Sequence, residues 1–324
     1  MRINSVAIIG SGIAGMRAAQ LLVEQGHKVT VFEKSSGTGG RLASSKLGEG
    51  SIDLGAPIID ANDVEFESWL REQGVEQWFP SNATLQLEKR KPISGWVMAP
   101  RSSALTRQLA GGVELRTNVR VAVVWPDREG VLLRDAAGEA LGHFDAVVIA
   151  APAPQAATLL DAIQRFRHRA EKTAVSAIWT MALSLPERPA VLADVDWLEG
   201  EDEVIARVVR DSSKPQRSGE NWIIQATEAW SQQVLDLEPD DVGREMLDAV
   251  SRAIGETLIP ENVRVHRWRY ARATPEQGHE NALWDEQSGI GACGDWLCGG
   301  NVEGAWRSAN ELVARILGSR LKVA

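Results

Sequence analysis

The stretch that decides the fold lies near the N-terminus, where residues 5–33 read SVAIIGSGIAGMRAAQLLVEQGHKVTVFE. The apolar run 5–9 is typical of a buried strand in a parallel sheet. A stretch with helical spacing of apolar residues follows and meets a glycine stop at Gly26. Residues 28–34 then alternate as a second strand. This order predicts a βαβ unit of about 30 residues and, with it, a doubly wound α/β sheet.

Three glycines follow the first strand with the spacing G-x-G-x-x-G, namely Gly10, Gly12 and Gly15. In such a motif the first glycine permits the tight turn, the second lets a pyrophosphate approach the backbone, and the third lets helix and strand pack closely. The free N–H groups at the helix start favour the phosphates. Glu33 ends the second strand, where a carboxylate accepts hydrogen bonds from ribose hydroxyls and repels a 2′-phosphate. The sequence therefore predicts a dinucleotide site that does not suit NADP.

The loop after the second strand, GTGGR at residues 37–41, supplies further glycines and an arginine. The forked donors of an arginine suit a pyrophosphate. Taken alone, the loop is interpreted equally well as a flexible surface loop with a solvated Arg41. Its place directly after Glu33 favours a contribution to the dinucleotide site.

The rest of the chain indicates a second structural domain, as a length of 324 residues suggests. The region 173–275 alternates strand-like runs with loops, which is typical of a separate α+β lobe. Helices are predicted at residues 63–79, 102–112, 155–170, about 239–257 and about 302–317, paired strands at 83–98, and mostly strand at 113–150. The expected fold class is α/β, with a Rossmann-type domain and an inserted α+β domain.

Composition excludes several classes of function. The formal net charge of −9 and the pI of about 5.2 argue against nucleic acid, whose phosphates require Lys and Arg surfaces, and against an anionic membrane. We recognise no signal peptide and no apolar window of about 20 residues, so we expect a cytoplasmic protein without a membrane partner. The two cysteines, Cys293 and Cys298, have no neighbouring histidine and do not form a C-x-x-C pair. We therefore expect no metal and no redox pair.

These motifs resemble those of the flavin-containing amine oxidase superfamily, whose FAD domain carries a glycine fingerprint, an acidic strand end and a following GGR. Three further segments carry the resemblance: DLGA at 53–56, DAVVIAAPAPQ at 145–155, and GACGDW with NVEGAW within 291–306. The resemblance implies that all three lie close to FAD. In the last one it implies that Asp295 contacts the ribityl–phosphate part and that the following helix points at the isoalloxazine.

The resemblance and the fingerprint together define the predicted cofactor site. The predicted FAD contacts are Gly10, Gly12, Ile13, Ala14, Gly15, Glu33, Lys34, Gly40, Arg41, Leu42, Gly55, Ala56, Pro57, Val121, Gly294, Asp295, Val302, Glu303 and Ala305. No cysteine or histidine stands where a covalent flavin bond is expected, so noncovalent FAD is predicted. The predicted domains are an FAD-binding domain of residues 1–60, 97–160 and 285–324, and a substrate domain of residues 61–96 and 161–284.

Within that superfamily the sequence most resembles the renalase family, especially its short bacterial members. The resemblance rests on DSSKPQR at 211–217, WIIQATEAWS at 222–231 and HRWRYARA at 266–273. It implies the oxidation of a small dihydropyridine, such as a misreduced isomer of NAD(P)H, by hydride transfer to FAD, with dioxygen reduced to hydrogen peroxide. Hydride loss from a dihydropyridine is driven by aromatisation, so no general base is required.

The candidate substrate-pocket residues are Trp96, His266, Trp268 and Tyr270, with Arg272 beside them. Residues 266–270 alternate, so His266, Trp268 and Tyr270 share one strand face. This face is interpreted either as a stacking wall over the flavin or as part of the core. Lys214 and Arg217 are interpreted either as ligands of a substrate phosphate or as solvated loop residues.

Two segments depart from the family pattern and leave the substrate open. Pro57 and Ile58 stand where the family has polar and aromatic groups. Arg101 and Ser102 stand where it has Gly-Met, and Arg101 either serves a phosphate- or carboxylate-bearing substrate or is an exposed residue at a helix start. Two alternatives to a renalase-like oxidase therefore stay open. One is an FAD amine oxidase or desaturase-like dehydrogenase, and the other is a catalytically degenerate FAD-binding protein.

Overall fold

The computed structural model describes residues 3–48, 50–276 and 279–318. The chain divides into two compact units. The first comprises residues 1–40, 105–175 and 272–324, and the second comprises residues 41–104 and 176–271. The predicted FAD-binding domain instead extends to residue 60 and resumes at 97. That division follows expected cofactor contacts and not compactness, and it stays a prediction.

The first unit is built on a six-stranded sheet in the order β18-β19-β12-β1-β2-β8. Its strands are β1 (Ser5–Ile9), β2 (Lys28–Phe32), β8 (Glu114–Arg116), β12 (Ala146–Ile149), β18 (Leu283–Asp285) and β19 (Ile290–Ala292). The pairs β1–β2, β1–β12, β12–β19 and β2–β8 are parallel, and only the edge strand β18 runs antiparallel to its neighbour. The predicted βαβ unit and Rossmann-type sheet are confirmed.

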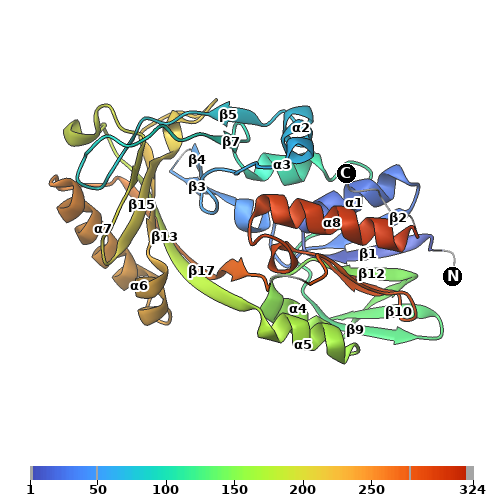
Figure 1. Cartoon of the computed structure of the whole chain (residues 1–324). Coiled ribbons are helices and arrows are strands. Elements are labelled where there is room, and N and C mark those ends of the chain that lie inside the picture. The colour runs from blue at the N-terminus through green and yellow to red at the C-terminus, as the bar shows by residue number, and fades with distance from the viewer. Residues whose placement is uncertain (1–2, 49, 277–278, 319–324) are drawn as a thin grey trace. The chain divides into compact units, whose positions relative to one another are not determined.

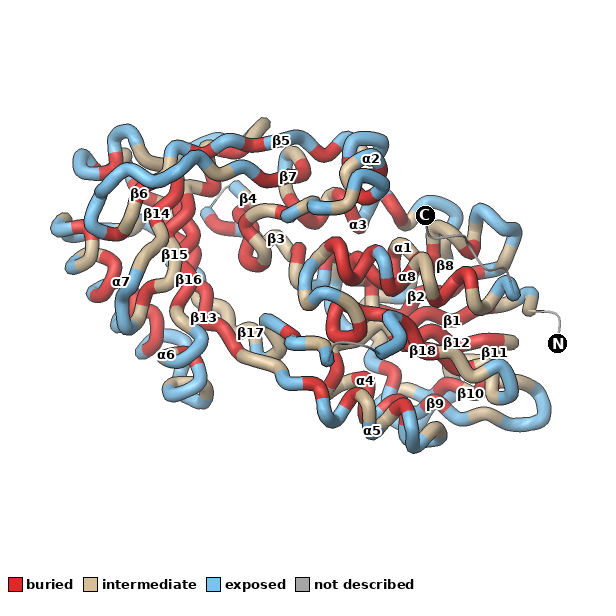
Figure 2. Tube along the Cα trace, in the orientation of Figure 1, coloured by how far each residue is buried: buried red, intermediate tan, exposed pale blue. Residues whose placement is uncertain are grey.

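Both faces of this sheet are covered, which is why its central strands are apolar along their whole length. Ala7 and Ile9 on one face of β1 join a core with the antiparallel strands β9 (Val121–Asp127), β10 (Gly130–Asp135) and β11 (Ala140–Phe144) and with the helices α4 (Ala153–Leu159) and α5 (Gln164–Lys172). On the other face α1 (Ile13–Glu24) and α8 (Val302–Ile316) lie side by side (Figure 1). Figure 2 shows the buried strands between these layers.

The second unit contains a six-stranded mixed sheet in the order β17-β13-β16-β15-β14-β6. Its strands are β6 (Asn82–Ala83), β13 (Ala174–Ser184), β14 (Trp197–Glu199), β15 (Ile205–Arg210), β16 (Asn221–Ala226) and β17 (Asn262–Thr274). Two strand pairs lie outside this sheet: β3 (Ser44–Leu47) with β4 (Gly50–Asp53), and β5 (Glu76–Trp78) with β7 (Gly95–Val97). The remaining elements of this unit are α2 (Val64–Glu72), the start of α3 (Ser103–Gln108), most of η1 (Gly40–Leu42), and η2 (Ala190–Leu192) and η3 (Asp211–Ser213).

The two faces of this sheet have different partners. Trp179 and Trp222 point to the face that α6 (Glu228–Gln233) and α7 (Pro239–Ile254) cover. Residues of alternate parity, such as Ala182 and Ile223, face the opposite side and pack with Leu54 from the segment after β4. The segment that the sequence places near the flavin therefore lies on the face away from the helices.

Several local predictions are corrected by the structure. Residues 83–98 do not form paired strands, because only short β6 and β7 are present and β7 pairs with β5 instead. The helix predicted at 155–170 is two helices, α4 and α5, separated by residues 160–163. The helix predicted at 63–79 ends at Glu72, since Gly74 adopts a positive φ of 74° just beyond it.

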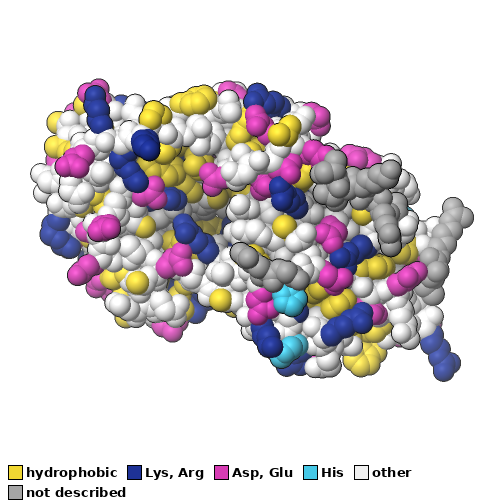
Figure 3. All heavy atoms as spheres, in the orientation of Figure 1, with side chains coloured by type: hydrophobic (Ala, Val, Ile, Leu, Met, Phe, Trp, Pro, Cys, Tyr) yellow, Lys and Arg dark blue, Asp and Glu magenta, His cyan; other side chains and the backbone are white. Residues whose placement is uncertain are grey.

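Charged side chains of both signs are interspersed over the face drawn in Figure 3, so neither sign forms a continuous patch there. Among the helices that the structure describes, none is both long and apolar enough to cross a membrane.

Candidate functional site

The carboxyl ends of the central strands of the first unit form the first part of the candidate site. Strand β1 lies between β2 and β12, so the connections on its two sides lead in opposite directions. The loops after β1 and β12 meet here, since a Cβ on Gly10 would lie 2.6 Å from the carbonyl oxygen of Ala150. Ligands of open parallel sheets bind beyond the carboxyl ends of the strands at such a reversal.

The glycine fingerprint at this point has the shape that a pyrophosphate requires. A Cβ on Gly15 would lie 2.0 Å from the Gly10 carbonyl oxygen, so close packing of α1 on the loop requires glycine there. A Cβ on Gly12 would instead meet only the Gly40 Cα, at 3.9 Å. Gly12 is the N-cap of α1 and offers no side-chain hydrogen bond. The first N–H groups of the helix therefore face a space that a larger side chain would fill, and these residues fit the FAD pyrophosphate.

Glu33 is nearly buried, with 7% of its surface exposed. Its Oε2 accepts hydrogen bonds from Ser11 N at 3.0 Å and Ser11 Oγ at 2.7 Å, and its Oε1 accepts one from Ser35 N at 2.8 Å. Oε2 already accepts two donors, and Oε1 has room for one more, so a ribose contact stays a prediction. The structure adds a role that the sequence did not suggest, because Glu33 fixes the loops after β1 and β2 to each other.

The C-terminal signature folds into one tight loop between β19 and α8. Asp295 is buried in the 3₁₀ helix η4 (Asp295–Leu297). A Cβ on Gly304 would lie 1.7 Å from the Cys298 carbonyl oxygen, so this loop can approach α8 only at a glycine. The N-cap side chain of Asn301 accepts a hydrogen bond from Gly304 N at 2.8 Å. The predicted contacts Gly294, Asp295, Val302, Glu303 and Ala305 thus belong to one local structure.

Both cysteines are unpaired. Burial raises the pKa of the Cys293 thiol to about 12, so it is protonated at neutral pH. Burial also raises the pKa of Cys298, which is half-buried. Among the described residues, no three His, Cys, Asp or Glu side chains lie together as metal ligands would.

In the second unit, the segment after β4 is held by hydrogen bonds to three other parts of the chain. The Leu54 carbonyl accepts the indole N–H of Trp268 at 2.8 Å, and the Gly55 carbonyl accepts Gln225 Nε2 at 2.9 Å. Ala56 N donates to the Arg41 carbonyl at 3.0 Å, and a Cβ on Gly55 would lie 1.8 Å from the same oxygen. The predicted contacts Arg41, Gly55 and Ala56 are therefore brought together in a rigid arrangement.

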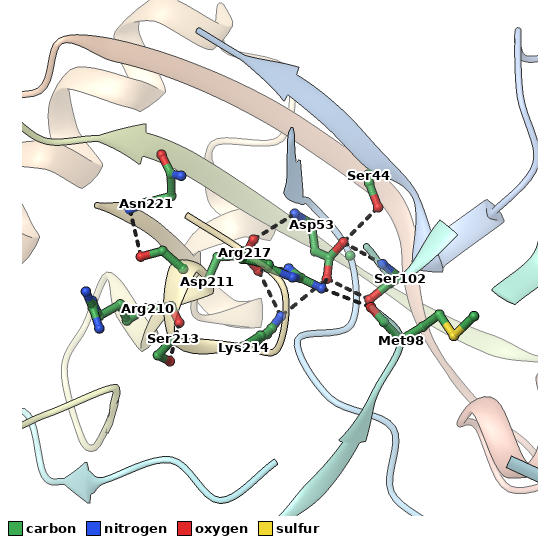
Figure 4. A network of polar contacts seen from close by, with 12 residues as sticks. Ser44, Asp53, Met98, Ser102, Arg210, Asp211, Ser213, Lys214, Arg217 and Asn221 are labelled. Atoms are coloured by element: carbon green, nitrogen blue, oxygen red, sulfur yellow. Dashed lines mark hydrogen bonds and ion pairs between the residues drawn. The ribbon is translucent and has the colours of Figure 1, made fainter. Parts of the chain in front are cut away.

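A buried ion cluster anchors the start of this segment (Figure 4). We define it as Asp53, Asp211, Lys214 and Arg217. Arg217 contacts Asp53 at 2.6 Å and Asp211 at 2.5 Å, and Lys214 contacts the same carboxylates at 3.3 and 2.9 Å. Ser102 donates its N–H and its hydroxyl to Asp53, at 2.9 and 2.6 Å. Neither interpretation of Lys214 and Arg217 from the sequence is right, because they are neither solvated nor free to bind a phosphate.

The electrostatics of the ion cluster favour its charged form. Burial by itself would raise the pKa of Asp53, but Lys214, Arg217 and the hydrogen bonds from Ser102 lower it well below its usual range. Burial would likewise lower the pKa of Arg217, and the two carboxylates raise it. Both shifts favour the charged forms of Asp53 and Arg217, and the cluster contains two acidic and two basic side chains.

Strand β17 alternates as predicted. On one face Arg267 donates to the Leu235 carbonyl at 2.7 Å, and Arg269 donates to Asp236 at 2.9 Å. On the other face the rings of His266 and Trp268 meet edge to face, with centroids 4.3 Å apart. Burial and the charge of Arg264 lower the pKa of His266, so its imidazole is neutral at pH 7. His266, Trp268 and Tyr270 are half-buried, and Trp268 packs against the core cluster that contains Leu54.

The other predicted residues lie as follows. Trp96 is buried in β7 beneath the guanidinium of Arg71, whose Cζ lies 4.7 Å from the centre of the ring, and its part in a substrate pocket stays a prediction. Arg41 donates to the Ala271 carbonyl at 3.2 Å. Ile13, Ala14, Leu42, Pro57 and Val121 are buried, Gly40 and Lys34 are exposed, and their contacts with FAD stay predictions.

Comparison with protein families gives two matches that together cover most of the chain. Residues 8–72 match an NAD(P)-binding Rossmann-like domain, and residues 78–317 match flavin containing amine oxidoreductases. A 4,4'-diapophytoene desaturase from Staphylococcus aureus (strain Newman) is 41% identical over 59 residues. That match covers 18% of this chain and only 12% of the desaturase.

Solved structures resemble the chain over nearly its whole length. Cyclohexylamine oxidase from Brevibacterium oxydans IH-35A has a TM-score of 0.74 at 13% identity, with 98% of this chain and 99% of that chain covered. Wild-type putrescine oxidase bound to putrescine has a TM-score of 0.73 at 12% identity, with 97% and 99% covered. A CLA-producing fatty acid isomerase from P. acnes has a TM-score of 0.71 at 12% identity, with 96% and 98% covered. At such identities the likeness shows the fold alone, and it confirms the predicted architecture.

Proposed function

Because the chain belongs to the family of flavin containing amine oxidoreductases, we propose that this FAD-dependent enzyme oxidises a small dihydropyridine, such as a misreduced isomer of NADH or NADPH. The substrate loses a hydride and leaves as an aromatic pyridinium. With one proton from solvent, the two electrons and the substrate's hydrogen end on dioxygen as hydrogen peroxide. When bound, FAD accepts the hydride and passes the two electrons on.

The proposal rests on one observation: the buried carboxylates of the second unit are already paired with basic side chains. Its two buried carboxylates, Asp53 and Asp211, are both neutralised inside the ion cluster. Of the half-buried acids of this unit, four are paired with arginines, and the other two accept backbone N–H groups. The four are Glu67, Asp196, Glu199 and Glu220, and the two are Asp63 and Glu256. An ammonium group that leaves water requires a partner of opposite charge. The geometry therefore favours a substrate that is neutral or anionic around its reacting ring over an alkylamine.

Different residues of the chain would bind the cofactor and the substrate. Gly12 and the start of α1 hold the pyrophosphate, and Glu33 orders the loops on either side. The half-buried face of β17 supplies Trp268 and Tyr270 as flat surfaces against which a dihydropyridine ring packs. The lowered pKa of His266 makes its imidazole a weaker base, which suits a hydride transfer that needs no base. We also propose that residues 1–60, 97–160 and 285–324 form the FAD-binding domain and that residues 61–96 and 161–284 form the substrate domain.

Family membership and the desaturase match support an amine oxidase or desaturase-type reaction as well as they support a renalase-like one. A substrate panel separates these reactions. The purified holoenzyme is given NADH isomers from borohydride reduction of NAD⁺, or putrescine, or cyclohexylamine, and hydrogen peroxide is measured. We expect peroxide with the isomers and none with the amines.

Each other result of the panel identifies an alternative. Peroxide from either amine would replace the proposal with an amine oxidase. Reduction of an artificial acceptor without consumption of dioxygen would indicate a desaturase-like dehydrogenase. A protein that retains FAD and turns over no compound of the panel would be a degenerate flavoprotein.

A further inference from the structure

A row of polar side chains crosses the sheet of the second unit on the face away from α6 and α7. Glu199, Arg207, Gln225 and Thr180 lie opposite one another in the successive strands β14, β15, β16 and β13. Arg207 donates to Glu199 at 2.6 Å and to the side-chain oxygen of Gln225 at 3.4 Å. Gln225 in turn donates to the Gly55 carbonyl. The one basic side chain of the row is therefore already paired with its one acidic side chain.

Two polar atoms of this row are buried and have no hydrogen-bond partner among the residues that the structure describes. They are the hydroxyl of Thr180 and Nε of Arg207. Thr180 is 0% exposed, so bulk water does not satisfy its hydroxyl either. A buried polar group without a partner is unfavourable, and such groups in native proteins are satisfied by a ligand or an internal water, or they serve a function. Both groups can donate, so an acceptor oxygen would satisfy either of them.

Thr180 belongs to the same side of the sheet as the half-buried face of β17. Strand β17 is the neighbour of β13 on the side away from β16. Arg267 lies over the ring of Trp179 on the face that the helices cover, with 5.2 Å between Cζ and the ring centre. The adjacent residues of the two strands, Thr180 and His266, therefore share the opposite face. His266 is half-buried and makes no hydrogen bond within the described part of the chain, so none holds its ring against a ligand.

We propose that Thr180 donates a hydrogen bond to a neutral carbonyl group of the substrate, such as a carboxamide, while the rest of the substrate packs against Trp268. All residues of this site belong to the second unit. A carbonyl oxygen brings no charge, which suits a row whose cation is paired with Glu199. The inference rests on the proposed function for the dihydropyridine ring. It narrows the substrate to dihydropyridines that carry a carboxamide or a similar carbonyl group.

The test uses two probes that differ only in the substituent of a pyridine ring, namely nicotinamide and 3-methylpyridine. Their affinities for the oxidised holoenzyme are measured by ligand-observed NMR titration. Thr180→Val keeps the shape of the side chain and removes only the hydroxyl. We expect this variant to bind nicotinamide about three- to tenfold more weakly, the range for one hydrogen bond. Its affinity for 3-methylpyridine should equal that of the wild type.

Thr30→Val is the matched control. Thr30 is buried in β2 of the first unit, and its hydroxyl donates to Glu114 at 3.1 Å. The control should leave both probe affinities unchanged and lower the urea concentration at the midpoint of unfolding, because it removes a satisfied hydrogen bond. Thr180→Val should not lower this midpoint, since the Thr180 hydroxyl has no partner in the protein without substrate.

Four results would overturn the proposal. In the first, wild type binds nicotinamide no more tightly than 3-methylpyridine. In the others, Thr180→Val leaves nicotinamide affinity unchanged, weakens both probes alike, or lowers the urea midpoint as Thr30→Val does. The last result would show that the hydroxyl is satisfied within the protein, as by an internal water. Neither probe donates a hydride, so the outcome is independent of whether the enzyme oxidises dihydropyridines.

Discussion

Replacing Lys214 by methionine lowers the free energy of unfolding by about 3–5 kcal/mol. The substitution keeps a long apolar stem beside Trp78, whose ring centre lies 5.7 Å from Nζ, and removes only the charge. Asp53 and Asp211 are then left with Arg217 as their one cation, so a net negative charge stays buried. Chemical denaturation with urea, monitored by circular dichroism, measures the loss.

Three comparisons make that result specific. Arg244→Gln also removes one cation, but from an exposed pair with Asp241, and is expected to cost less than about 1 kcal/mol. Adding Asp211→Asn to Lys214→Met restores charge balance and recovers part of the stability.

The pH dependence of stability follows from Asp53. Because the folded pKa of Asp53 is lowered, its contribution to the free energy of unfolding is present above the unfolded pKa of about 3.9 and is lost as the pH falls below that value. The gap between wild type and Lys214→Met should therefore narrow in acid. Equal losses for Lys214→Met and Arg244→Gln would contradict the account.

Replacing Gly12 by valine lowers FAD affinity by about 100-fold or more, equivalent to roughly 2.7 kcal/mol, and leaves the apoprotein folded. Gly12 has φ −75° and ψ −176°, a backbone that any L residue adopts. A Cβ there meets no protein atom closer than 3.9 Å. The added side chain therefore starts in open space beside the N–H groups of α1, where the pyrophosphate is expected to approach. The flavin content of the purified protein and the affinity of the apoprotein for FAD measure the effect.

Gly37 supplies the matched control for this substitution. It lies in the neighbouring glycine-rich loop and shows no positive φ, and a Cβ on it would meet no atom within 4 Å. Gly37→Val should retain FAD at the level of the wild type. If Gly12→Val also retains it, the fingerprint does not hold the pyrophosphate and the assignment of this site fails.

The βαβ unit and the two faces of β17 could be predicted from the sequence, because the residue patterns that indicate them lie within short stretches of the chain. The glycine spacing and the acidic end of the second strand predict the βαβ unit of residues 5–33. The alternation of residues 266–270 predicts the two faces of β17, and the paired arginines Arg267 and Arg269 confirm it. Thr227 also carried a usable signal, since its side chain caps α6 and separates that helix from β16.

The ion cluster could not be predicted, because its partners are far apart in the chain. Lys214 and Asp53 are separated by 161 positions, and no local pattern marks them as a pair. A lysine beside a proline in a polar loop has the same appearance whether it is solvated or buried. The role of Gln225 could not be predicted for the same reason, because its side-chain amide donates to the Gly55 carbonyl 170 positions earlier in the chain. In both cases the partner of the buried charged or polar group lies outside the local stretch of sequence, so the local sequence cannot identify it.

Anaerobic mixing of the holoenzyme with purified NADH isomers shows whether a dihydropyridine reduces the flavin. We expect the visible absorbance of the flavin to bleach with one equivalent of isomer, NAD⁺ to be released, and admission of air to restore the absorbance. Ordinary amines at the same concentration should leave the spectrum unchanged. If no isomer bleaches the flavin, or if an amine bleaches it instead, the enzyme is not a dihydropyridine oxidase.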